Sequence, residues 1–122
     1  MRTKIYSADS TLSIHILELI GFRVAQINLC EYCMAMHHKE LKYLGDTEVR
    51  LSSVSNWKCS SFFSNEEKGL LALTDHLAQL NNHQPSGHIF PLLLPYFCLD
   101  EIDRLSFAIK QISNWTLIMK NF

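Results

Sequence analysis

Apolar residues in the first third of the chain recur every three or four positions. Within residues 11–28 they lie on one side of a helix, as Leu12, Ile16, Leu19, Ile20, Val24 and Ile27. This spacing matches the period of an α-helix. We therefore predict a helix over residues 11–28, and its opposite side is apolar as well.

Start and stop signals divide the next part of the chain into two further helices. The second helix is predicted to begin around Cys30 and to end at Gly45, because glycine readily adopts the left-handed conformation that follows many helices. Asp46 or Thr47 is a suitable N-cap for a third helix, which we expect to run through about Asn56.

The second half of the chain has the same helical character. Ser64 followed by Glu67 is a capping-box pattern, and the helix that it opens carries Leu70, Leu73, Leu77 and Leu80. Residues 90–97 form a shorter candidate helix. A final helix from about residue 99 presents Ile102, Leu105, Ile109 and Ile112. No segment alternates for long enough to require a strand, so we predict an all-α bundle of about six helices. The length of the chain predicts one domain, residues 1–122.

Composition and charge disfavour some classes of function. The chain has a formal net charge of -1 and no cluster of basic residues, which disfavours nucleic-acid binding. The longest apolar run is too short to cross a bilayer, and the first residues lack the pattern of a secretion signal. We expect a cytoplasmic protein without membrane segments.

Because 48% of the residues are hydrophobic, a homo-oligomer is favoured. Of the four cysteines, Cys59 and Cys98 are expected to be thiols without a role.

The stretch CEYCMAMHHKEL holds the candidate chemistry. If a helix starts near Cys30, then Cys30, Cys33 and His37 share one stripe that continues into Leu41 and Leu44. Cys30 then lies at the helix N-terminus, where unpaired N–H groups and the helix dipole favour a thiolate. His37, one turn after Cys33, is placed to accept its proton.

A carboxylate outside this stretch completes the candidate set. Glu18 shares an apolar stripe with Gly21, Phe22 and Ala25, which disfavours its charged form and suits a proton donor and acceptor. The alternative is that Glu18 reaches solvent or pairs locally with His15.

Two other interpretations of the cysteine pair remain open. A zinc site could use Cys30, Cys33, His37 and a fourth ligand such as His15 or His83, although no second pair of ligands supplies the other half. A structural pair of buried thiols is the simplest alternative. A haem attachment site is excluded, because no histidine directly follows the second cysteine.

The complete spacing, E-x11-C-x2-C-x3-H, resembles the AhpD-like alkylhydroperoxidase branch of the carboxymuconolactone decarboxylase family. The surrounding sequence ELIGFRVAQINLCEYCMAMHHKELKYLGDTEVRL is similar to the core of that family. The segment WKCSSFFSNEEKGLLALTDHLAQL resembles a later helix of the family and IKQISNW its closing helix. The resemblance covers nearly the whole chain from about residue 11.

The resemblance implies an all-helical subunit that assembles into a dimer, trimer or hexamer, and a thiol-dependent peroxidase active in antioxidant defence. It implies that Cys33 attacks the peroxide, that Cys30 resolves the sulfenic acid as a Cys30–Cys33 disulfide, and that His37 and Glu18 relay protons. No cofactor is implied beyond this redox-active disulfide. An external dithiol or thioredoxin-like protein would serve as reductant.

The chain also departs from the family pattern. Tyr32 stands where the best-known peroxidase members have a histidine between the cysteines, so one candidate relay group is absent. The family's lactone decarboxylases lack the C-x-x-C pair, which makes decarboxylation a poor interpretation. A non-catalytic oligomeric protein that senses redox state or exchanges disulfides is the alternative function.

Overall fold

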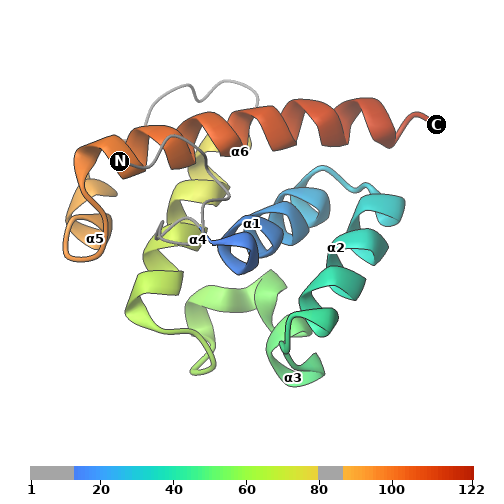
Figure 1. Cartoon of the computed structure of the whole chain (residues 1–122), viewed down its shortest axis with the longest axis horizontal. Helices are drawn as coiled ribbons and strands as arrows, with labels where there is room; N and C mark the ends of the chain where they lie inside the picture. The colour runs from blue at the N-terminus through green and yellow to red at the C-terminus, as the bar shows by residue number, and fades with distance from the viewer. Residues whose placement is uncertain (1–12, 80–86) are drawn as a thin grey trace.

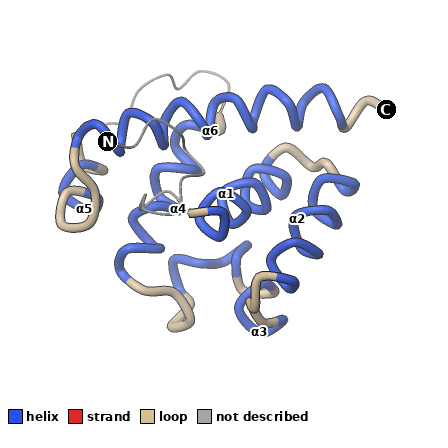
Figure 2. Tube along the Cα trace, in the orientation of Figure 1, coloured by secondary structure: helices blue, strands red, loops and turns tan. Residues whose placement is uncertain are grey.

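The computed structural model describes residues 13–79 and 87–122, and all the regular elements in these residues are helical (Figure 2). The predicted all-α class is confirmed. These residues form six α-helices and one 3₁₀ helix: α1 (Ile14–Ile27), α2 (Glu31–Tyr43), α3 (Glu48–Leu51), η1 (Val54–Cys59), α4 (Asn65–Leu77), α5 (Phe90–Leu93) and α6 (Leu99–Met119). Among the described helices, none combines the length and apolar character that a membrane span requires.

Helix α1 lies in the middle of the molecule, with α2, α4 and α6 around it (Figure 1). Its two sides contribute to different apolar clusters. Ile20 and Val24 pack with residues of α4, α5 and α6, whereas Leu19 and Phe22 pack with Leu41 of α2 and with residues of α3, η1 and α4. Burying each such side chain contributes about 1.5–3 kcal/mol. The apolar residues on both sides of α1 are explained by this central position.

The N-terminus of α4 confirms the predicted capping box. The Ser64 hydroxyl accepts the Glu67 backbone N–H at 3.1 Å, and the Glu67 carboxylate accepts the Ser64 backbone N–H at 2.9 Å. The leucines at positions 70, 73 and 77 are fully buried. Leu80 of the predicted helix lies outside the described residues.

Two predicted helices are shorter in the structure. The third helix was expected to run through about Asn56. This expectation was wrong, because α3 ends at Leu51 and a separate 3₁₀ helix follows. The hydroxyls of Ser52 and Ser53 both donate to the Val49 carbonyl at 3.0 Å, and such side-chain bonds compete with helical backbone bonds. The helix expected over residues 90–97 stops at residue 93, before Pro95, which has no N–H to donate.

A network of charged side chains ties α1, α3, α4 and the loop before α3 together. Arg50 binds Asp46 at 2.9 Å and Glu67 at 2.8 Å, and Asp46 also binds His15 at 2.8 Å. Burial raises the pKa of Asp46, but hydrogen bonds from Arg50, His15 and the Thr47 backbone outweigh it, so the pKa lies below its usual range. Burial likewise raises the pKa of Glu67, and the bonds from Arg50 and from Ser64 reverse the shift. The carboxylates are therefore held in their charged form.

Candidate active site

The turn between α1 and α2 places Cys30 at the start of α2. The Cys30 N–H donates to the Ala25 carbonyl at 3.0 Å, and the Leu29 N–H donates to the Gln26 carbonyl at 3.3 Å. This pair of hydrogen bonds ends a helix when the residue after the C-cap is left-handed. Here that residue is Leu29, with φ 59°. Such a φ is uncommon for a residue other than glycine. Cys30 is the N-cap of α2, so the predicted start of the second helix is confirmed.

Asn28 anchors this turn to α6, a contact that no sequence pattern indicates. Its side-chain amide donates to the Ser113 hydroxyl at 3.1 Å, and Ser113 is buried on α6. A lone asparagine after a helix is commonly read as a cap or turn residue. Its partner lies 85 residues away in the chain, and only the packing of α6 against α1 brings the two together.

Cys30 and Cys33 are joined by a disulfide, with their Cα atoms 5.2 Å apart. The Cys33 backbone N–H donates to the Cys30 sulfur at 3.3 Å. Both residues are only 1% exposed, and with Ala25 they form a small apolar cluster covered by Met34 and by Met119 at the end of α6. The sulfur atoms are thus shielded from solvent.

His37 and Glu18 meet across the α1–α2 contact. The His37 Nδ1 lies 2.7 Å from the Glu18 carboxylate, and the side chains are 14% and 24% exposed respectively. In the tautomer that donates from Nδ1 to the carboxylate, Nε2 of the ring is left as a proton acceptor. His37 lies one turn after Cys33 on α2. The structure therefore places two bonded pairs, Cys30–Cys33 and Glu18–His37, one helical turn apart along the α1–α2 contact.

Near the site, the local pairing considered as an alternative for Glu18 and the expectation for Leu44 were both wrong. Glu18 does not pair with His15, because His15 binds Asp46 instead. Leu44 does not continue the buried stripe of α2, since it is the C-cap residue and is 39% exposed. Tyr32, between the two cysteines, is 62% exposed and projects outside the buried cluster.

The remaining cysteines and histidines form no second centre in the described part of the chain. Cys59 and Cys98 are exposed free thiols. Within residues 13–79 and 87–122, no three His, Cys, Asp or Glu side chains gather as a metal site would require. His83, one of the fourth ligands considered for zinc, lies outside the described residues.

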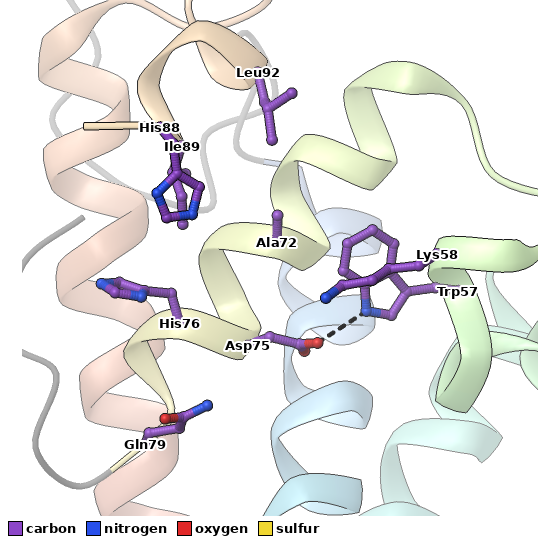
Figure 3. Close-up of a pocket in the computed structure, with 9 residues that line it drawn as sticks. All are labelled: Trp57, Lys58, Ala72, Asp75, His76, Gln79, His88, Ile89 and Leu92. Atoms are coloured by element: carbon purple, nitrogen blue, oxygen red, sulfur yellow. Dashed lines mark hydrogen bonds between the residues drawn. The ribbon is translucent and has the colours of Figure 1, made fainter. Parts of the chain in front are cut away.

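A separate hollow of about 370 Å³ lies between η1, α4 and the start of α5 (Figure 3). Trp57 and Lys58 line one side of it, and His76 and His88 line the other. Asp75 is held at its edge by the Trp57 indole N–H at 3.0 Å and by Arg23 at 2.7 Å. None of the four candidate residues lines this hollow, so it is distinct from the cysteine site.

Fold and site together define an all-helical dithiol protein in which a histidine–carboxylate pair shares the helix contact with a C-x-x-C disulfide. The sequence profile of the carboxymuconolactone decarboxylase family matches residues 1–76, and the chain belongs to this family. The resemblance found in the sequence is confirmed.

Two individual proteins extend the comparison. The chain is 28% identical over 113 residues to the uncharacterized protein YdfG of Bacillus subtilis (strain 168), covering 93% of this chain and 77% of that protein. It is also similar, with a TM-score of 0.85 and 29% identity, to a crystal structure from Agrobacterium tumefaciens. That structure is of a protein of unknown function described as a candidate antioxidant defence protein AhpD, and the match covers 96% of this chain and 80% of that one.

Proposed function

We propose that the protein is a thiol-dependent peroxidase that acts in antioxidant defence. The observation that carries this proposal is the 2.7 Å bond between Glu18 and His37, one helical turn from Cys33. A buried thiol ionises poorly on its own, and a histidine oriented by a carboxylate is an effective acceptor for its proton. Membership of the family and the likeness to the Agrobacterium protein support an oxidoreductase role, although the family also includes decarboxylases.

The proposed reaction begins with transfer of the Cys33 proton to Nε2 of His37. The Cys33 thiolate then attacks the outer oxygen of the hydroperoxide, so that an S–O bond forms as the O–O bond breaks. Cys33 is oxidised to a sulfenic acid, and the leaving alkoxide takes the proton from His37 and departs as the alcohol. The Cys30 thiol next attacks the Cys33 sulfur, which forms the disulfide and releases water.

A dithiol reductant closes the cycle by thiol–disulfide exchange. Two exchange steps transfer the disulfide to the reductant and restore the thiols of Cys30 and Cys33. We propose a thioredoxin-like protein for this role, and a cytoplasmic homo-oligomer as the working form. The Cys30 sulfur accepts a hydrogen bond from the Cys33 backbone N–H at the start of α2. This hydrogen bond stabilises negative charge on the Cys30 sulfur when Cys30 acts as attacking or leaving thiolate.

Replacing Cys33 by serine tests the proposal. Consumption of cumene hydroperoxide with dithiothreitol as reductant should be lost in Cys33→Ser and unchanged in the matched control Cys59→Ser, which removes an exposed free thiol. Full activity in Cys33→Ser would contradict the assignment of Cys33.

A second candidate function is a redox sensor or disulfide-exchange protein that oxidises without cycling. The observation that favours it is the 1% exposure of both sulfur-bearing residues, because a buried disulfide exchanges slowly with external thiols. Counting turnovers separates the two functions: many equivalents of peroxide consumed per subunit support the peroxidase, whereas one equivalent with every reductant offered supports the sensor.

A further inference from the structure

Gly21 occupies the middle of α1, where glycine is a costly choice for a helix. A Cβ atom built at Gly21 would lie 2.5 Å from Cε1 of His37, 2.7 Å from Nε2 and 2.8 Å from Nδ1. Unbonded carbon atoms ordinarily approach to about 3.5–4.0 Å. The imidazole therefore fills the space that any other side chain would need.

Gly21 lies between the two parts of the site on the face of α1 that meets α2. Glu18, one turn before it, bonds Nδ1 of the ring at 2.7 Å. Ala25, one turn after it, packs with Cys30 and Cys33. The ring is consequently fixed at its edge by the carboxylate and at its face by the bare backbone of Gly21.

We propose that Gly21 is a positioning residue that holds the His37 imidazole against α1, in reach of Glu18. This role rests on the proposed function, because it concerns the proton acceptor of Cys33. A methyl group at position 21 would have to displace the ring by about 1 Å to reach an ordinary contact distance. Nδ1 and the carboxylate are now 2.7 Å apart. A shift of about 1 Å away from the carboxylate would lengthen this distance beyond the normal hydrogen-bond range.

The clash at Gly21 differs from that at the other close-packed helical glycine in the described residues. A Cβ at Gly69 of α4 would meet the backbone carbonyl oxygen of Leu92 at 2.7 Å. A backbone cannot move aside without shifting α5, whereas the His37 ring is the end of a rotatable side chain. Gly21→Ala should therefore preserve the fold and disturb the site, and Gly69→Ala should do the reverse.

Nitrogen NMR of the histidine rings tests the placement of His37 directly and requires no activity. In the oxidised protein, Gly21→Ala should shift the His37 Nδ1 signal away from that of a nitrogen hydrogen-bonded to a carboxylate. Gly69→Ala should leave that signal unchanged and lower the melting temperature. An unaltered His37 signal in Gly21→Ala would overturn the proposal.

Kinetics give the second readout, with a double variant as the internal control. Gly21→Ala should slow peroxide oxidation of the reduced dithiol about 10- to 100-fold, since a misplacement near 1 Å can cost that much. In a His37→Ala background the same change should cause no further loss, and an equal loss there would show that Gly21 acts elsewhere.

A double variant tests the same contact if Gly21→Ala does not fold. Recovery of folding in Gly21→Ala combined with His37→Ala would assign the clash to the His37 ring and support the proposal. Failure of that double variant to fold would refute it. If the wild-type protein consumes no peroxide, the proposed function fails, while the NMR comparison still decides the role of Gly21.

Discussion

Replacing Arg50 by glutamine removes the cation that joins two carboxylates from different parts of the fold. Arg50 donates to Asp46 at 2.9 Å, to Glu67 at 3.0 and 2.8 Å, and to the Phe62 carbonyl at 2.8 Å. The Asp46 side chain is only 1% exposed and that of Glu67 is 21% exposed. Glutamine retains much of the aliphatic stem but leaves both carboxylates without their cation.

The size of the loss follows from this burial. Breaking a buried ion pair costs about 3–5 kcal/mol, because an uncompensated charge remains. His15 still binds Asp46, and Glu67 is partly exposed, so we expect a loss of about 3 kcal/mol, at the lower end of that range. For a chain of 122 residues, such a loss lowers the melting temperature by about 10 °C.

The pH dependence gives the prediction a sign. Burial raises the pKa values of Asp46 and Glu67, and the Arg50 bonds reverse this shift, so both lie below their ordinary values in the folded protein. Carboxyl groups with lowered pKa stabilise the fold above the unfolded pKa, about pH 4, and lose that contribution as the pH falls through the folded pKa. The difference between wild type and Arg50→Gln should be complete at pH 7 and shrink below about pH 4.

Urea unfolding at pH 7 and pH 3 measures this difference. The matched control is Lys42→Gln, which removes a 3.9 Å pair with Glu48 between side chains 42% and 63% exposed. We expect the control to change stability by less than about 0.5 kcal/mol. Stability of Arg50→Gln equal to that of Lys42→Gln at pH 7, or a deficit that grows on acidification, would contradict this prediction.

Two further predictions concern the cysteine site. Glu18→Gln should slow oxidation of the reduced dithiol by peroxide about tenfold, because it weakens a charge-assisted hydrogen bond worth about 1.5–3 kcal/mol; stopped-flow measurement should show no change in Glu48→Gln, which alters the exposed carboxylate bound to His38. Met119→Ala should accelerate reduction of the disulfide by dithiothreitol several-fold, because Met119 packs over the cysteine pair. Truncating the exposed neighbour Ile118, which is 52% exposed, should leave that rate unchanged, and equal rates in all three proteins would contradict the shielding role of Met119.

Sequence periodicity was sufficient for the long helices, because their apolar stripes face real neighbours. The expectation of one helix from Asp46 or Thr47 through about Asn56 failed, because the hydroxyls of Ser52 and Ser53 bond the Val49 carbonyl and α3 ends at Leu51. A hydroxyl that competes with the backbone leaves no trace in hydrophobic periodicity. The break therefore became visible only in the structure.

The residue pattern predicted the members of the candidate site, and the family resemblance implied the Cys30–Cys33 disulfide and a proton relay of His37 and Glu18. Spacing on one helix placed Cys33 and His37 a turn apart. The partner of Glu18 could not be chosen in this way, because His15 is near in sequence whereas His37 is 19 positions away. The packing of α1 on α2 decides the choice. Gly21 carried no signal either, because a glycine within a helix is conspicuous only when its neighbour across the contact is known.

The histidine–carboxylate pair and the two cysteines differ in their exposure to solvent. Glu18 is 24% exposed and His37 is 14% exposed, so the pair that holds the Cys33 proton in the proposed reaction is more exposed to solvent than the sulfur atoms are. The cysteines are 1% exposed and lie under Met34 and Met119, so in the proposed reaction peroxide and reductant must pass this cover to reach the sulfur atoms. In the proposed reaction Glu18 affects the ionisation of Cys33 and Met119 affects access to the sulfur atoms, so changes at these two residues act on different factors. Their effects on the rate of peroxide oxidation should therefore multiply in the double variant, as expected for independent sites.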